Sequence, residues 1–181
     1  MTDRLIPFSP PMVSALMWSD PSIRKVETRR VKPRNIHPGD RVGVQEALFC
    51  AGNRLTYYAA DRSPALRDGR FMDWTWQPRS LGARYCPRWA VRTWREVVEV
   101  RIERLGSIDD AGAVREGMAV LPFLASATID ERQWGHARHE AELVRIGTPR
   151  HSLRDAYAMA WRGLHGTWDP DMPVQVIRWE P

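Results

Sequence analysis

A regular alternation of apolar and charged residues in the middle of the chain constrains the fold most. The alternating residues are Val98, Val100 and Ile102 on one side and Glu99, Arg101 and Glu103 on the other. A period of two is typical of a β-strand that buries one face and exposes the other to water. We therefore expect a strand over 98–105, with its apolar side chains in a core and its charged side chains in solvent.

Shorter patterns of the same kind predict other strands, and cap and turn residues delimit helices between them. The expected strands span 41–49, 54–59 and 174–179. The expected helices span 11–19, 107–117, 128–146 and 152–164. Short strands interspersed with helices indicate an α+β fold, specifically a small mixed β-barrel with peripheral helices.

Particular residues define the ends of these helices. We expect Ser107 to cap the helix that Gly117 ends, and Thr128 and Glu131 stand in capping-box register at the start of the next one. The helix over 152–164 is amphipathic. The stretch 61–82 is rich in Arg, Pro, Gly and Asp, and is expected on the surface.

The composition is that of a globular protein, since 43% of the 181 residues are hydrophobic and 27% are charged. No apolar run approaches the roughly 18 residues that a membrane-spanning helix needs, so we expect no membrane span. The first residues lack the basic and apolar regions of a signal peptide. Cys50 and Cys86 are too few for a disulfide framework, and we read them as structural. A single domain in the reducing cytoplasm is the resulting expectation.

Positive charge is concentrated in two segments of the chain. There are 27 basic and 22 acidic residues, a formal net charge of +5. Segment 24–41 holds seven basic residues against two acidic ones, and segment 74–95 holds five arginines and no acidic residue. Clustering of this kind favours an anionic partner.

Lysine is scarce: 25 of the 27 basic residues are arginine, and only Lys25 and Lys32 remain. A GC-rich genome explains most of this bias. A buried lysine can lose its proton whereas arginine effectively cannot, so a lysine retained in a basic cluster also points to acid–base chemistry. Lys25 begins the sequence KVETRR, in which Thr28 supplies a hydroxyl and Arg29 and Arg30 supply forked donors for phosphate or carboxylate. The competing interpretation is a solvated basic loop.

Segment 74–95 interleaves its arginines with aromatic residues, a composition typical of proteins that stack bases and bind phosphates. The alternative is that some of the tryptophans belong to a core. We expect Trp94 to be buried, and Arg88 and Trp89 to belong to a binding site. His136 and His139 do not have the spacing of a metal motif, and no glycine-rich phosphate loop is present. We expect neither a metal nor another cofactor.

Six segments form an ordered series that carries a family resemblance. They are FSPPM (8–12), RKVETRRV (24–31), PGDRVGVQEA (38–47), CPRWAVR (86–92), IDDAGAVREGM (108–118) and WDPDMPVQVIRWEP (168–181). The series resembles the ASCH-domain proteins of phages and prophages, which belong to the PUA-like β-barrel superfamily. The resemblance implies one PUA-like domain over 1–181 with insertions at about 51–81 and 119–165, encoded by a phage or prophage in a bacterial host.

Some small members of that family are N(4)-acetylcytidine amidohydrolases. Their site uses a lysine and a threonine from a G-x-K-x-x-T block and a glutamate from the helix that follows the central strand. The resemblance thus implies catalytic roles for Lys25, Thr28 and Glu116. The residues assigned to substrate binding are Arg29, Arg30, Glu46, Arg88 and Trp89.

The chain departs from the family in three respects. Residues 21–23 replace the glycine that precedes the lysine block, and position 45 is Gln where phage relatives often carry Arg. The two insertions have no counterpart in the minimal amidohydrolases. They could cover the cleft, enlarge the substrate or recruit a partner.

Three functions remain open from the sequence. The first is hydrolysis of an acylated or otherwise modified nucleoside or nucleobase, with Thr28 as nucleophile, Lys25 as base and Glu116 as proton relay. The second is a non-catalytic RNA- or DNA-binding module, and the third is a phage accessory protein that acts on modified DNA bases. The first function requires Glu116 to lie within hydrogen-bond reach of Lys25, directly or through one water.

Overall fold

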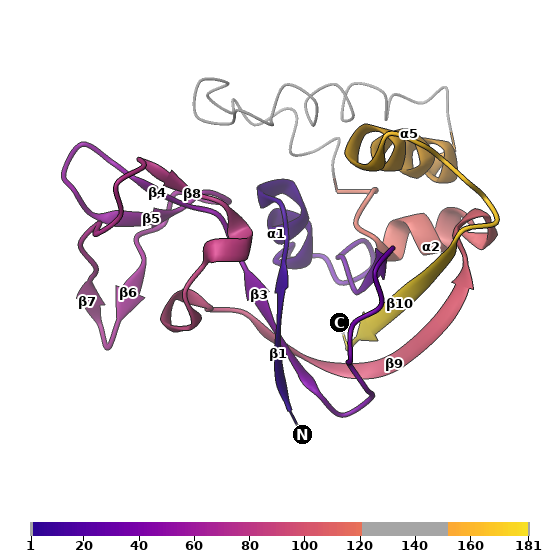
Figure 1. Ribbon diagram of the computed structural model, residues 1–181, viewed down its shortest axis with the longest axis horizontal. Helices are drawn as coiled ribbons and strands as arrows, with labels where there is room; N and C mark the ends of the chain where they lie inside the picture. The colour runs from indigo at the N-terminus through magenta and orange to yellow at the C-terminus, as the bar shows by residue number, and fades with distance from the viewer. Residues whose placement is uncertain (1, 121–151, 181) are drawn as a thin grey trace. The chain divides into compact units, whose positions relative to one another are not determined.

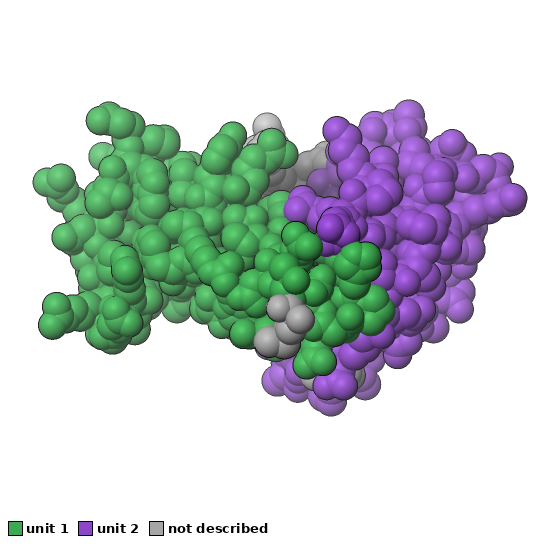
Figure 2. Space-filling model, turned by 60° about the horizontal axis from the view of Figure 1, so that its bottom comes forward, with its two compact units in different colours: residues 1–14, 36–97 green, residues 15–35, 98–181 purple. Residues whose placement is uncertain are grey.

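The computed structural model of this chain describes residues 2–120 and 152–180, which carry both strands and helices, so the α+β prediction is confirmed (Figure 1). The chain divides into two compact units, coloured separately in Figure 2. Unit 1 comprises Met1–Ser14 and Ile36–Val97, and unit 2 comprises Ala15–Asn35 and Val98–Pro181. A helix with the length and hydropathy of a membrane span is absent from the described residues.

Unit 1 is built on short strands. β1 (Asp3–Pro7) runs parallel to β3 (Arg41–Gln45), which pairs antiparallel with the first residues of β9 (Trp94–Arg104). A three-stranded sheet of order β5-β4-β8 contains β4 (Leu48–Cys50), β5 (Thr56–Tyr58) and β8 (Ser80–Leu81). The hairpin of β6 (Leu66–Arg67) and β7 (Arg70–Phe71) and the 3-10 turns η1 (Ala83–Tyr85) and η2 (Arg88–Ala90) complete the unit. α1 (Pro10–Leu16) begins in unit 1 and ends in unit 2.

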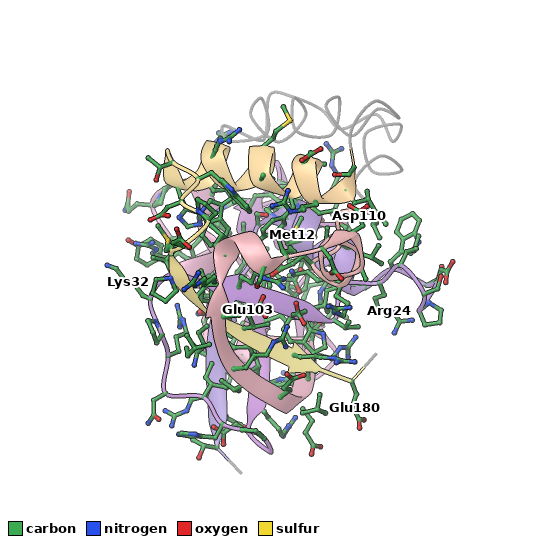
Figure 3. The ribbon with its side chains drawn as sticks, turned by 90° about the vertical axis from the view of Figure 1, so that its right-hand side faces the viewer. Met12, Arg24, Lys32, Glu103, Asp110 and Glu180 are labelled. Carbon is green, nitrogen blue, oxygen red and sulfur yellow. The ribbon has the colours of Figure 1, made fainter. Side chains whose placement is uncertain are left out.

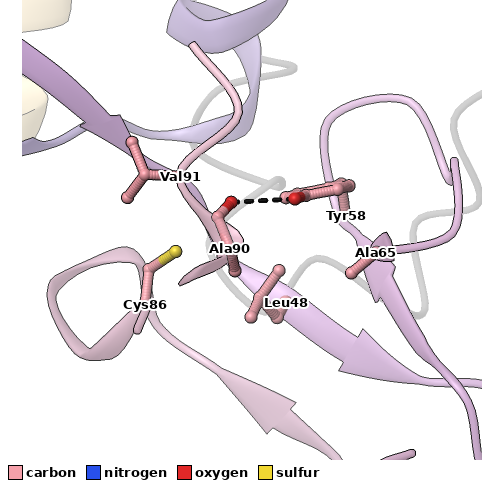
Figure 4. Close-up of a cluster of buried hydrophobic side chains, with 6 residues drawn as sticks. All are labelled: Leu48, Tyr58, Ala65, Cys86, Ala90 and Val91. Atoms are coloured by element: carbon pink, nitrogen blue, oxygen red, sulfur yellow. Dashed lines mark hydrogen bonds between the residues drawn. The ribbon is translucent and has the colours of Figure 1, made fainter. Parts of the chain in front are cut away.

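A small hydrophobic core lies beside the second sheet of unit 1 (Figure 4). Its buried members are Leu48, Tyr58, Ala65, Cys86, Ala90 and Val91. The Tyr58 hydroxyl donates a hydrogen bond of 2.8 Å to the Ala90 carbonyl, which ties β5 to η2. Trp94, which we expected to be buried, is half-buried and packs against this cluster.

Unit 2 contains the rest of β9, which is followed in the sheet by β10 (Pro173–Trp179) and then by β2 (Glu27–Arg30). β10 and β2 are antiparallel, with Thr28 opposite Ile177. η3 (Leu105–Ser107) connects β9 to α2 (Asp110–Arg115), and α2 packs against both β2 and α5 (Leu153–His165). This arrangement brings the start of β2 and the end of α2 together.

Several predicted elements differ in their extent. The strand expected over 41–49 is two strands, since Glu46 and Ala47 separate β3 from β4. The surface stretch 61–82 is largely exposed as expected, and it also contains the β6–β7 hairpin and β8. Each sheet has edge strands within the described ranges, so the closed barrel remains a prediction.

The helix ends follow local rules with one exception. Ser152 caps α5 by accepting a hydrogen bond from the Asp155 N–H, and Gly166 ends that helix in the left-handed conformation. The cap of α2 is Asp109, whose side chain accepts from the Gly112 N–H at 2.6 Å, and not Ser107. The Ser107 hydroxyl instead donates to the Arg104 carbonyl at 2.7 Å within η3. The helix expected over 128–146 lies outside the described residues.

The face assignment of β9 was wrong. Val98 is 43% exposed and Ile102 is 61% exposed, although both were expected in a core. The charged side chains of the opposite face, Glu99, Arg101 and Glu103, are partly buried instead and form ion pairs with one another and with β2. The reason is that β2 presents charged residues to this face, and ion pairing offsets the cost of removing such groups from water.

Candidate active site

Lys25 lies in the segment that leads from α1 into β2, and backbone hydrogen bonds hold it there. Its N–H donates to the Ala15 carbonyl at 3.0 Å, and the Val26 N–H donates to the Arg115 carbonyl at 2.8 Å. Lys25 is only 1% exposed. Lys32, the other lysine of the chain, is exposed and projects outward in Figure 3. The two lysines therefore occupy opposite environments.

The side-chain nitrogen of Lys25 has three hydrogen-bond acceptors in the described part of the chain. Nζ lies 2.6 Å from Oε2 of Glu116, 2.9 Å from the Glu116 carbonyl and 2.6 Å from the Glu27 carbonyl. These acceptors match the three N–H donors of a protonated lysine. The hydrogen bond between Lys25 and the Glu116 carboxylate joins residues 91 positions apart in the sequence.

The electrostatic environment of Lys25 contains opposing effects. Burial lowers the pKa of the Lys25 amine, because the charged form loses its hydration. The charge of Glu116 and its hydrogen bond act in the other direction, while the neighbouring Arg30 and Arg29 lower the pKa further. The net direction is downward, which brings the neutral amine closer to physiological pH than in an exposed lysine.

Glu116 is placed by the end of α2. It is the C-cap residue, and its backbone N–H donates to the Gly112 carbonyl at 3.0 Å. The next residue, Gly117, has φ +92°, and a Cβ atom there would lie 2.9 Å from the Cβ of Ala15 and 3.1 Å from the Cβ of Lys25. A glycine is therefore required both by the backbone conformation and by the close approach of the helix end to Lys25.

Arg29 on β2 binds three glutamates. Its Nη1 lies 3.2 Å from Oε1 of Glu116 and 2.8 Å from Oε1 of Glu27, and its Nε and Nη2 donate to Glu103 at 2.9 and 2.7 Å. Burial by itself lowers the pKa of Arg29, but the carboxylates of Glu116 and Glu27 outweigh burial and raise it. The guanidinium is only 2% exposed, and these carboxylates supply the compensation that a buried cation needs.

Further arginines complete the cluster. Oε2 of Glu27 lies 3.2 Å from Arg101 Nη2 and 3.4 Å from Arg115 Nε, and Arg101 also donates to Glu103 at 2.9 Å. Figure 3 labels Glu103 on β9. We call the whole set the Lys25 network: Lys25, Glu27, Arg29, Arg101, Glu103, Arg115 and Glu116.

Thr28 and Arg30 alternate along β2 with Glu27 and Arg29, which places the two pairs on opposite faces of the strand. Thr28 is 5% exposed, and its hydroxyl makes no hydrogen bond within the part of the chain that the structure describes. Burial lowers the pKa of Arg30 to about 10, and the nearby charge of Glu116 partly offsets this effect. Hydrogen bonds thus join Lys25 to Glu116 and Glu116 to Arg29. Among the described residues, no such bond joins any of these three side chains to the Thr28 hydroxyl.

α5 adds a residue that the sequence pattern assigned only to an apolar helix face. Tyr157 is buried, and the guanidinium carbon of Arg29 lies 5.9 Å from the centre of its ring. Burial raises the pKa of the Tyr157 hydroxyl well above its usual value, and the charge of Glu116 adds to this effect. Tyr157 is therefore a neutral phenol beside the Lys25 network.

Three of the expected substrate-binding residues belong to unit 1, where each has local partners. Glu46 is 1% exposed and binds Arg92 through two hydrogen bonds of 2.9 and 2.8 Å. Arg88 pairs with Asp3, and its guanidinium lies 5.3 Å from the centre of the Trp94 ring. The ring of Trp89 stacks on Trp76 with centroids 6.5 Å apart. Within the unit these residues form separate contacts.

Sequence reasoning missed Glu27 and Glu103. Glu27 stands inside the KVETRR motif, and its position between Lys25 and Arg29 was a signal for an acidic partner. Glu103 follows Glu99 and Arg101 on one face of β9, and we expected that face to lie in solvent. Alternating opposite charges on one strand face also fit an ion-paired interior, because each charge then has a partner.

Within 2–120 and 152–180 no group of three or more His, Cys, Asp or Glu residues could hold a metal ion. His136 and His139 lie outside those ranges. Cys50 and Cys86 form no disulfide, and burial raises the pKa of the Cys86 thiol to about 11, which disfavours a nucleophilic thiolate.

Comparison of the chain with protein-family models, with curated proteins and with solved structures found no match.

Proposed function

We propose that this protein is an ASCH-type amide hydrolase with a PUA-like barrel, acting on N(4)-acylated cytidine or a related modified nucleoside in the cytoplasm of a phage-bearing bacterium. The observation that carries the proposal is the 2.6 Å contact between Nζ of Lys25 and Oε2 of Glu116. The resemblance selected these two residues, and the hydrolase hypothesis requires them to be within hydrogen-bond reach. A more distant Glu116 would have removed its chemical basis.

The environment of the pair supports proton transfer. Both residues are almost completely buried, so the charged forms of both lose hydration, and burial lowers the pKa of the Lys25 amine. Of the three acceptors that Lys25 has among the described residues, the Glu116 carboxylate can bind a proton covalently, whereas the other two are backbone carbonyls. Moving one proton from Lys25 to Glu116 produces a neutral amine beside a neutral acid.

In the proposed reaction the neutral Lys25 accepts the hydroxyl proton of Thr28 as the Thr28 oxygen attacks the acyl carbon. The bond from the acyl carbon to N4 of cytosine then breaks, and Lys25 returns the proton to the leaving nitrogen. A water hydrolyses the resulting ester, releasing the carboxylic acid and restoring Thr28. Because the hydrogen bonds of Lys25 Nζ to described residues go to Glu27 and Glu116 and not to Thr28, the proposal requires a substrate-bound arrangement that brings Thr28 and Lys25 together.

The arginines divide into two roles in this proposal. Arg29 already binds Glu27, Glu103 and Glu116, so we assign it to positioning the Glu116 carboxylate. Arg30 lies on the same face of β2 as Thr28 and is assigned to polarising the acyl carbonyl or binding a phosphate. Glu46, Arg88 and Trp89 remain proposed contacts to the nucleoside.

One observation favours a second candidate, a non-catalytic nucleic-acid-binding module. The three acceptors around Lys25 match a protonated lysine, and a permanently charged lysine is not a base. In that case the Lys25 network only stiffens unit 2, and the basic residues around it bind phosphates.

Turnover of N(4)-acetylcytidine separates the two candidates. Wild-type protein is incubated with the nucleoside and with the same base in an oligonucleotide, and cytidine and acetate are measured by mass spectrometry. Lys25→Met removes the amine, and Lys32→Met is the matched control because Lys32 is exposed. We expect turnover in the wild type and in Lys32→Met and its loss in Lys25→Met. Folded wild-type protein that converts neither substrate would refute the hydrolase and favour the binding module.

The hydroxyl of Thr28 is tested by two variants that separate its chemistry from its shape. Thr28→Ser keeps the hydroxyl, whereas Thr28→Val keeps the shape and removes it. We expect measurable turnover in the serine variant alone. Equal turnover in both would exclude Thr28 as the nucleophile.

A further inference from the structure

We propose that the β6–β7 hairpin of unit 1 is a binding surface for single-stranded nucleic acid. The surface consists of Leu66, Arg67, Arg70 and Phe71, and we call it the hairpin surface. None of its four residues takes part in the proposed hydrolase reaction, whose reacting residues Lys25, Thr28 and Glu116 belong to unit 2. The inference therefore does not rest on the proposed function.

The sequence at the tip explains why the hairpin forms. Asp68 and Gly69 connect the strands with φ values of +52° and +75°. Two consecutive positive φ values are the signature of a type I′ turn, for which Asp-Gly is a preferred sequence. In the resulting register Leu66 pairs with Phe71, and Arg67 pairs with Arg70.

In this register the apolar and the cationic side chains of the hairpin lie on opposite faces. Directly opposed residues of an antiparallel pair share a face, and successive residues alternate between faces. Leu66 and Phe71 therefore form an apolar face, and Arg67 and Arg70 form a cationic one. Phe71 is 61% exposed and Leu66 is 46% exposed, so the ring is accessible for stacking.

The base of the hairpin is anchored. Ala65, immediately before β6, is fully buried in the core of unit 1, and its N–H donates to the Thr56 carbonyl at 2.8 Å. Met72, immediately after β7, accepts from the Thr56 N–H at 2.8 Å and donates to the Ala65 carbonyl at 3.2 Å. A platform fixed in this way loses little conformational freedom on binding.

The charge of the sequence segment that contains the hairpin favours an anionic partner. Six exposed arginines between residues 54 and 84 form no ion pair with any described residue: Arg54, Arg62, Arg67, Arg70, Arg79 and Arg84. The acids of the same stretch are Asp61, Asp68 and Asp73, and Arg92 already binds Asp61 at 2.8 Å. Guanidinium groups in excess over carboxylates are suited to phosphates, which they bind through paired N–H donors.

Aromatic exposure favours single strands over other polyanions. Phe71, which is 61% exposed, offers a ring face on which an unpaired base stacks. Bases of a duplex are already stacked and do not reach such rings. An anionic membrane would need a larger apolar face than one leucine and one phenylalanine.

The test measures fluorescence anisotropy with labelled 12-residue pyrimidine oligonucleotides of RNA and DNA, the matching duplexes, and phosphatidylserine vesicles. We expect tighter binding of the wild type to the single strands than to duplex or vesicles. Arg67→Ala with Arg70→Ala should weaken binding at least tenfold and reduce the slope of log affinity against log salt by about 1.4, from two lost phosphate contacts. Phe71→Ala should weaken binding about tenfold through lost stacking, with rescue by Phe71→Trp.

The control is Arg104→Ala, which removes an exposed arginine that pairs with Asp171 in unit 2. It should leave affinity unchanged. Absence of binding to any single strand, equal affinity for duplex, a preference for vesicles, or wild-type affinity in the hairpin variants would each overturn the proposal. Binding that persists in Lys25→Met separates this surface from the proposed hydrolase reaction, so the failure of one is distinguishable from the failure of the other.

Discussion

Arg29 donates from Nη1 to the same carboxylate of Glu116 that binds Lys25, at 3.2 Å and through the other oxygen. Two cations thus share one buried anion, and Arg29 also binds Glu27 and Glu103. This arrangement makes Arg29 the residue on which the Lys25 network depends.

Replacing Arg29 with Gln should therefore be strongly destabilising. Three carboxylates would lose their shared partner, and the expected loss in the free energy of unfolding is about 3–5 kcal/mol. Urea titration of wild type and variant measures it. Arg104→Gln is the matched control, because Arg104 and Asp171 are 76% and 77% exposed, and its effect should be about 0–1 kcal/mol. Similar losses in both variants would show that the network contributes nothing beyond a surface pair.

Gly117 should tolerate no side chain. Alanine there must adopt a positive φ and must also meet Ala15 and Lys25, at 2.9 and 3.1 Å from its Cβ. Gly166→Ala is the control, since Gly166 has φ +81° but nothing within 4 Å of the added atom. We expect about 1 kcal/mol for Gly166→Ala and about 2–4 kcal/mol for Gly117→Ala in the same denaturation assay. Equal costs would mean that α2 does not approach Lys25 as closely as described.

The two neighbouring valines of β9 test the orientation of that strand. Val97 is 1% exposed and Val98 is 43% exposed. Threonine keeps the shape of valine but introduces a hydroxyl, so Val97→Thr should cost about 1–3 kcal/mol and Val98→Thr less than about 0.5 kcal/mol. The reverse order would restore the face assignment that the sequence alone predicts.

The wrong face assignment of β9 shows what the sequence alone could not predict. The alternation from Val98 to Glu103 predicted a strand correctly, but which face is buried depends on what packs against it. β2 contributes Glu27 and Arg29 there, and no feature of β9 itself encodes this pairing. Local signals were more informative, since Gly117 follows the end of α2 as expected, although the cap of that helix is Asp109 and not Ser107.

The candidate site was predictable only in part. Lys25 and Glu116 were selected through a family resemblance, and their contact spans 91 positions. Arg29 was assigned to substrate binding, and the structure adds its ion pairs with Glu27 and Glu103, since a buried guanidinium requires anions that the sequence spacing does not reveal.

Cys86 should give a pH-dependent contribution to stability. Burial raises the pKa of its thiol from 9.0 to about 11, so the folded state holds this proton more tightly than the unfolded state. The resulting stabilisation is complete below pH 9.0 and is lost as the pH rises towards about 11. Unfolding free energies of wild type and Cys86→Ala should therefore converge over that range. A difference that is independent of pH would contradict the burial of this thiol.

The most direct test of the central claim asks whether Lys25 and Glu116 act as one unit in catalysis. Turnover of N(4)-acetylcytidine is measured for the wild type, Lys25→Met, Glu116→Gln and the double variant, each checked for folding by circular dichroism. Groups that act together in one proton transfer should each lower kcat by about 10²–10⁴ when removed, and the double variant should lose little more than either single variant. Single variants that retain wild-type turnover, or losses that multiply in the double variant, would contradict the account.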